Sequence, residues 1–133
     1  MAGDVVWPVE VNPRYTASVE VFERAYGTTA LTLHIAACRG ELPTSRAPNE
    51  AESTAGKAIV YATEHGRVPK AFGELVQQLD AGSQWPCLAD IPDTGTRLQP
   101  GHPIATVLAD GSSPTAVERR LRELASQVQR VVC

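Results

Sequence analysis

Hydrophobic residues recur along this chain in short stretches whose spacing changes from one stretch to the next. Near the N-terminus, residues 5–11 are apolar and largely β-branched apart from Pro8 and Glu10, which predicts a short strand leading out of a sheet. Pro8 cannot donate to a ladder, so it disfavours a central position for this strand. The strand is predicted to end at the turn signal formed by Asn12 and Pro13.

Two short helices are predicted next. Thr16 can cap a helix that runs to about Tyr26, where Gly27 is a natural C-terminal stop. Thr28 can cap a second helix that runs to about Arg39. Both segments show helical rather than alternating periodicity, so we expect a helical pair directly after the first strand.

The second of these helices carries an apolar stripe that includes a histidine. Leu31, His34, Ile35 and Cys38 follow the i, i+3, i+4, i+7 spacing of one helix face, and Gly40 ends the helix. Because His34 lies within this apolar stripe, we interpret it as a buried core histidine rather than a catalytic one.

The remainder of the chain alternates between β and helical patterns. Residues 41–55 are polar and rich in Pro, Ser, Thr and Glu, which predicts an exposed loop. Strands are predicted at 56–62, 88–91 and 103–108, and a short helix at 68–79. The last helix has the clearest periodicity, with a charged opposite face. Its apolar positions, at steps of four and three, are Val117, Leu121, Leu124, Val128 and Val131.

Composition bounds the classes of function. Hydrophobic residues make up 43% and charged residues 20% of the chain, the balance of an ordinary folded domain. The net charge of −3 offers no positive excess, which argues against nucleic acid as a partner. No apolar run approaches the roughly 20 residues of a membrane-spanning helix, and no secretory signal is recognisable, so we expect no membrane partner.

The cysteines and histidines are scattered. The cysteines are odd in number and far apart, which favours a reduced protein in the cytoplasm. None stands at C-x-x-C spacing, so the sequence does not favour a zinc site. The residues concerned are Cys38, Cys87, Cys133, His34, His65 and His102.

One segment combines groups that suit metal and phosphate chemistry. On an extended strand Glu10 and Asn12 point to the same side, which places a carboxylate and an amide oxygen together. Both are hard oxygen ligands of the kind Mg²⁺ prefers alongside substrate phosphates. Pro13 turns the chain, so Arg14 lies near the same point and can pair with a phosphate or carboxylate. The helix that follows turns its N-terminal N–H groups the same way, which also favours an anion.

This segment, E-V-N-P-R followed by a small residue and Ser18, resembles the last catalytic strand of the ATP-grasp superfamily. Biotin carboxylase and the purine-biosynthesis carboxylate ligases belong to that superfamily. The resemblance implies that Glu10 and Asn12 are ligands of the Mg²⁺ ions that bridge the ATP phosphates. It further implies that Arg14 is a catalytic, substrate-binding residue, and Ser18 a second contact to the substrate. The implied cofactors are Mg²⁺ and ATP, in the context of a complete grasp domain, and the implied substrate is a small carboxylate.

The resemblance extends beyond the motif. The family has a glycine and a second helix after the first, and the L-x-x-H-x-x-A-x-x-G pattern of residues 31–40 is similar to that helix. Gly56-Lys57-Ala58 and residues 100–111 resemble the small β domain that follows the grasp. We therefore expect an α+β fold with a short N-terminal strand, two helices, a small barrel-like β unit and a C-terminal helix. The predicted division is 1–42 for the last strand and helices of an ATP-grasp-like domain, 43–55 for an exposed loop, and 56–133 for the β domain with its helix.

Two features depart from the family pattern. The earlier grasp elements, including the lysines that hold the ATP phosphates, have no counterpart here, and the only lysines are Lys57 and Lys70. Phosphoryl transfer depends on several groups acting together, so two ligands and one arginine cannot supply it. We therefore expect a C-terminal fragment or split subunit that is inactive alone and needs the missing N-terminal grasp region or a partner subunit.

An alternative function stays open. The β unit and the arginine-bearing last helix could instead dock another protein subunit as a non-catalytic adaptor. The DNA upstream of Met1 discriminates between the two, because an in-frame glycine-rich loop with grasp lysines would indicate the ligase. A nucleic-acid module is poorly supported, since the chain lacks a positive excess and has few aromatic residues.

Overall fold

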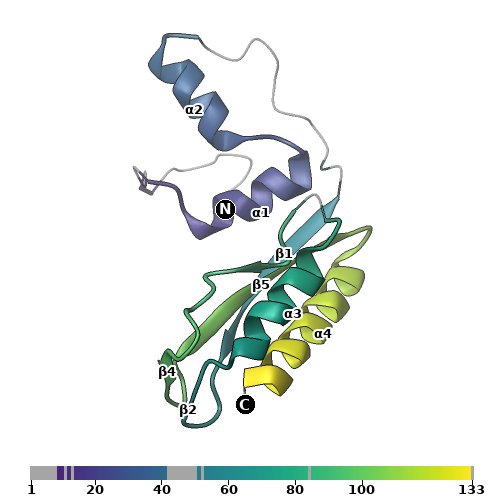
Figure 1. Cartoon of the computed structure of the whole chain (residues 1–133). Coiled ribbons are helices and arrows are strands. Elements are labelled where there is room, and N and C mark those ends of the chain that lie inside the picture. The colour runs from purple at the N-terminus through teal and green to yellow at the C-terminus, as the bar shows by residue number, and fades with distance from the viewer. Residues whose placement is uncertain are drawn as a thin grey trace.

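A computed structural model describes the chain except for residues 1–8, 11, 13, 42–50, 52, 84 and 133. The described residues form helices and short strands in mixed order, so the predicted α+β class is confirmed (Figure 1). In chain order the elements are α1 (Ala17–Tyr26), α2 (Ala30–Cys38), β1 (Thr54–Tyr61), β2 (Gly66–Arg67), α3 (Lys70–Asp80), β3 (Leu88–Ala89), β4 (Arg97–Leu98), β5 (Pro103–Gly111) and α4 (Pro114–Val132).

The main sheet is antiparallel and has β5 at its centre. β1 pairs along one side of β5, from Thr54 opposite Gly111 to Tyr61 opposite Pro103, and β3 pairs along the other side. β2 and β4 form a separate two-stranded ribbon. The β unit is therefore an open sheet with a ribbon beside it, and no closed barrel is present among the described residues.

The core lies between this sheet and two helices that cover one of its faces, α3 and α4 (Figure 1). Six consecutive residues of the central strand, 104–109, are buried, so its side chains are shielded from solvent on both faces and the strand is a nearly continuous apolar run. Its one buried hydroxyl, Thr106, donates a hydrogen bond of 2.7 Å to Asp90 Oδ2. The fully buried side chains, each worth about 1.5–3 kcal/mol of burial, are Phe72, Ile104, Val107, Leu108, Leu124 and Val128.

The N-terminal helices lie at one end of the sheet. α1 ends at Gly27, whose φ of 59° is the left-handed conformation predicted for a helix stop there. It packs beside the start of β1, where the Ser53 backbone N–H donates to Ala25 O at 3.2 Å. α2 extends away from the sheet (Figure 1), and none of its residues is buried.

The N-terminal region differs from the sequence expectation at His34. The interpretation of His34 as a core histidine is wrong, because α2 has no packing partner in the described chain and His34 is exposed. Of the strand predicted over residues 5–11, positions 5–8 and 11 lie outside the described residues. Val9 and Glu10 belong to neither sheet.

The contact between β1 and α4 generates a stability prediction. A Cβ added at Gly56 would lie 3.0 Å from Val117 Cγ1 and 3.3 Å from Leu121 Cδ1. Gly56→Ala should therefore lower the free energy of unfolding by about 1–3 kcal/mol through overpacking. Gly73 in α3 has open space at the same position, so Gly73→Ala should raise it by about 0.5–1 kcal/mol. Urea unfolding measures both, and a stabilising Gly56→Ala would contradict the packing described here.

Candidate functional site

The motif residues Glu10, Asn12 and Arg14 are all exposed, ahead of α1. Asn12 Nδ2 donates a hydrogen bond of 3.1 Å to Glu10 Oε1, so the structure brings these two side chains together. Arg14 makes no hydrogen bond or ion pair with either of them. The expected contact between Glu10 and Asn12 is therefore present, and the expected approach of Arg14 to them is not. The turn predicted at Pro13 lies outside the described residues.

The Glu10–Asn12 pair can offer oxygen ligands without rearranging the chain. Both side chains face solvent, so a half-turn of the Asn12 amide would present its oxygen to a cation beside the Glu10 carboxylate. Within the described ranges, no group of three or more His, Cys, Asp or Glu side chains is placed to hold a metal ion. A Mg²⁺ ion at this pair would therefore take its remaining ligands from phosphate oxygens or water, the usual arrangement for Mg²⁺.

Ser18 lies in the first turn of α1, four residues after Arg14 in the sequence. It is exposed, and its hydroxyl lies 3.0 Å from Thr16 Oγ1. Thr16 occupies the N-cap position but makes no side-chain hydrogen bond to the helix backbone. The N-terminus of α1 therefore keeps N–H groups without a side-chain cap, which leaves them open to an anionic group.

A buried carboxylate, Glu23, joins α1 to α2 and was not singled out from the sequence. Its exposed fraction is 7%. Glu23 Oε1 accepts the backbone N–H of Ala30, the first residue of α2, at 2.6 Å. Glu23 Oε2 accepts the Tyr15 hydroxyl at 2.6 Å. Glu23 thus caps α2 from outside the helix and also holds the segment that leads from the motif into α1.

The same hydrogen bond changes the acidity of Tyr15. The bond to Glu23 raises the pKa of the Tyr15 phenol to about 12. Partial burial of the hydroxyl and the negative charges of Glu23 and Glu20 act in the same direction. The neutral phenol is therefore the form that the folded chain stabilises.

A buried arginine, Arg24, ties α1 to the sheet. Its side chain is 2% exposed, and Nη2 donates to the carbonyl oxygen of Pro86. Glu20 lies 3.7 Å away and Asp110, on β5, 3.8 Å away, while the guanidinium stands 5.6 Å from the Trp85 ring centre. The Arg24 Nε finds no hydrogen-bond partner in the part of the chain that the structure describes.

A small cavity of about 300 Å³ adjoins this arginine. Its charged lining residues are two arginines and one aspartate. Arg24 is already engaged by Pro86, Glu20 and Asp110, so the cavity leaves little unpaired charge to attract an ion. The lining residues are Arg24, Ser83, Trp85, Cys87, Leu108, Ala109, Asp110 and Arg120.

The most unusual surface belongs to α2. Leu31 is 55%, Leu33 42% and Ile35 44% exposed. Because apolar residues occur all round this helix, it has the composition of a buried helix rather than a surface one. The described part of the chain provides nothing that covers it. The sequence signal for this surface is the apolar stripe of residues 31–38, which predicts a covered helix face.

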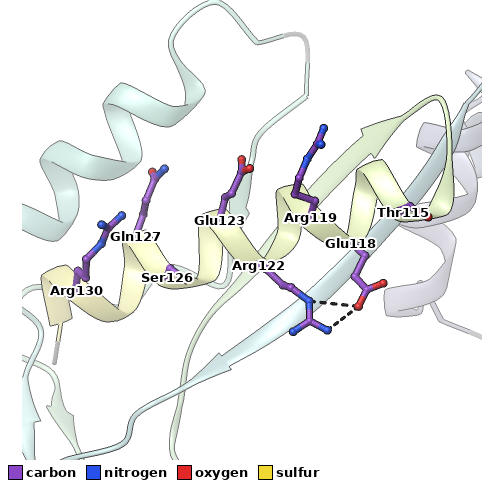
Figure 2. Close-up of a pocket in the computed structure, with 8 residues that line it drawn as sticks. All are labelled: Thr115, Glu118, Arg119, Arg122, Glu123, Ser126, Gln127 and Arg130. Carbon is purple, nitrogen blue, oxygen red and sulfur yellow. Dashed lines mark hydrogen bonds and ion pairs between the residues drawn. The ribbon is translucent and has the colours of Figure 1, made fainter.

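A larger hollow, about 660 Å³, follows the polar face of α4 (Figure 2). All of its lining residues come from that single helix. Figure 2 shows Arg119, Glu123 and Gln127 projecting to one side, and Glu118 and Arg122 to the other. Arg122 and Glu118 form an ion pair of 2.6 Å, and both side chains are mostly exposed. The hollow is therefore a solvated helix face, as the charge pattern predicted, and not a binding site.

Comparison with known proteins adds no further constraint. Neither a protein-family model, nor a curated protein, nor a solved structure matches this chain. No helix in the described ranges is long and apolar enough to cross a membrane.

The Arg24 contacts predict local unfolding when the guanidinium is removed. Arg24→Met keeps an unbranched apolar chain but loses the bond to Pro86 and the charge near Asp110. We expect amide protection in α1 and α2 to fall by about 1–3 kcal/mol, while protection in β5 and α4 stays unchanged. Native-state hydrogen exchange measures this. Arg122→Met is the control, because that arginine is exposed and should matter little. Uniform loss of protection across the sheet would contradict the assignment.

The Tyr15–Glu23 bond predicts a late alkaline transition. Since the folded pKa of about 12 exceeds the usual 10.0, the bond stabilises the fold below pH 10 and this contribution is lost as the pH rises through about 12. Ultraviolet titration of the tyrosines should show a late-titrating component that Tyr15→Phe abolishes. Glu23→Gln should move this component to lower pH. A component that persists in Tyr15→Phe would contradict the bond.

Proposed function

We propose that this chain supplies part of the Mg²⁺·ATP and carboxylate site of an ATP-grasp-type ligase and acts only together with a complementary grasp region. The observation that carries the proposal is the contact between Glu10 and Asn12, 3.1 Å, directly ahead of α1. A carboxylate and an amide in contact, followed by a guanidinium and an uncapped helix N-terminus, are the groups that this chemistry requires.

The reaction class assigns each residue a role. A substrate carboxylate oxygen attacks the γ-phosphorus of ATP, ADP leaves, and an amine or other nucleophile then displaces phosphate from the acyl phosphate. Bound Mg²⁺ supplies charge neutralisation for the phosphates. Glu10 and Asn12 would bind the Mg²⁺ ion through their side-chain oxygen atoms and so keep it beside the phosphates. Arg14 pairs with the substrate carboxylate or its phosphorylated form, and Ser18 contacts the substrate from the first turn of α1.

The uncovered surface of α2 supports the need for a complement. Leu31, Leu33 and Ile35 are about half exposed, so each would gain on the order of 1 kcal/mol on full burial, and together they offer a covering polypeptide an apolar anchor. The Glu23 cap fixes α2 to α1, and the segment before α1 carries the motif. A grasp region seated on α2 would therefore lie close to Glu10 and Asn12, and could bring the phosphate-binding lysines that this chain lacks.

A second candidate, the adaptor, is favoured by a different observation. Ile59, Tyr61 and Ile91 are 46–49% exposed on or beside the main sheet. Glu10 and Asn12, in contrast, have no sheet behind them in the described residues. If the motif residues do not bind a cation, docking of another subunit on these apolar surfaces becomes the better account.

A paramagnetic probe on the chain itself tests the proposal. Mn²⁺ replaces Mg²⁺ at oxygen ligands and broadens the NMR signals of nearby nuclei. We expect selective broadening around Glu10 and Asn12, reaching residues 14–18, and its loss in Glu10→Gln. The control is Glu74→Gln, because Glu74 is an exposed carboxylate on α3, away from the motif.

The outcomes separate the two candidates. Broadening centred on residues 10–18 that depends on Glu10 supports the ligase site. Broadening spread over surface carboxylates, equal in Glu10→Gln and Glu74→Gln, would refute it and favour the adaptor. Nucleotide alone should bind weakly or not at all, since the chain lacks the other phosphate-binding groups. Tight ATP binding to the isolated chain would contradict the dependence on a complement.

A further inference from the structure

A histidine and a cysteine meet on the last turn of α2. His34 Nε2 and Cys38 Sγ lie 3.7 Å apart, and both side chains are exposed. The two residues are four positions apart in a helix, so the backbone itself places them on one face. Neither residue belongs to a Cys-x-x-Cys or longer ligand set, so the pair is not part of a recognisable zinc motif.

The separation matches the spacing of two ligands on one metal ion. With a Zn–N bond of about 2.0 Å and a Zn–S bond of about 2.3 Å, tetrahedral geometry separates the two ligand atoms by about 3.5 Å. The observed 3.7 Å needs only a small adjustment of two exposed side chains. Imidazole and thiolate are the ligands that soft and borderline cations select, in contrast to the oxygen pair at Glu10 and Asn12.

The position on the helix also suits a cation. Residues 34–38 form the final turn of α2, where the helix dipole presents partial negative charge, and no basic residue occupies that turn. Arg39 follows directly at the C-cap position, one residue beyond the pair.

From these observations we infer that His34 and Cys38 form a two-ligand site for a thiophilic divalent cation, Zn²⁺ being the natural occupant. In the free chain, water completes the tetrahedron. His34 and Cys38 share the apolar stripe of Leu31 and Ile35, so a polypeptide that covers α2 is placed to exchange those waters for its own ligands. The site stands independently of the ligase proposal, because it uses different residues and a different class of metal.

Cobalt(II) is the probe for this site, because its bond to a thiolate produces a charge-transfer absorption that oxygen and nitrogen ligands do not give. The fully reduced chain is titrated with Co²⁺, and Zn²⁺ is then added to displace it. We expect one ion per chain with this absorption. Cys38→Ser should abolish the absorption, and His34→Ala should weaken binding about tenfold or more, since even groups that only support metal ligands contribute 10–100-fold.

Control variants test whether cobalt binding depends on the position of the Cys38 thiol. Cys87→Ser removes a thiol elsewhere and should leave the titration unchanged. The double variant Ala36→Cys with Cys38→Ser keeps the number of cysteines but places the thiol on another side of the helix, and it should lose the site. Because α2 is exposed, these changes should leave the fold intact, and circular dichroism checks this. Cobalt–thiolate absorption that persists in Cys38→Ser, or that is unaffected by His34→Ala, would overturn the inference. Mn²⁺ results at Glu10 have no bearing on this outcome.

Discussion

The buried guanidinium of Arg24 is the interaction on which the placement of the N-terminal region depends. Burying a charge is costly unless it is paired, and Arg24 meets this requirement with a backbone carbonyl, two carboxylates and an aromatic face. Its partners come from α1, from the loop before β3 and from β5. The contact therefore fixes α1 against the sheet. Glu23, the neighbouring residue, carries the same constraint outward by capping α2 and holding Tyr15. Two adjacent side chains thus orient the motif segment at one end and α2 at the other.

The β unit and the N-terminal region differ in how much of their apolar surface is buried. The β unit has its own core, because α3 and α4 bury one face of the sheet, although Ile59, Tyr61 and Ile91 remain about half exposed. The N-terminal region is held in place but not enclosed, since α2 exposes apolar residues all round and the motif side chains face solvent. A region that is positioned accurately and left uncovered is what a shared site would require of one contributing chain. The ligase proposal and the inferred metal site both place chemistry at that uncovered end, with oxygen ligands ahead of α1 and a nitrogen–sulfur pair on α2.

Much of the secondary structure could be predicted from local patterns, and the tertiary roles could not. The periodic apolar positions of α4 predicted a helix there, and the capping and stop signals of α1 predicted its bounds within a residue or two, because those signals act over one or two turns. Glu23 and Arg24 read as ordinary surface charges, since their partners are far away in the sequence or in another helix. His34 was misassigned because an apolar stripe indicates a covered face without saying what covers it. For the motif, the chemistry of Glu10 and Asn12 was readable from residue type, but the strand expected to support them was not observed at Val9 and Glu10.

The central claim is that Glu10 and Asn12 complete a nucleotide site only when another polypeptide supplies the rest. Its most direct measurement is the affinity for Mg²⁺·ATP of this chain combined with a grasp region that carries phosphate-binding lysines. The account predicts that the combination binds nucleotide and that Glu10→Gln weakens this binding about tenfold or more, as expected for the loss of a charged ligand. Nucleotide binding by the combination that is indifferent to Glu10 would contradict it.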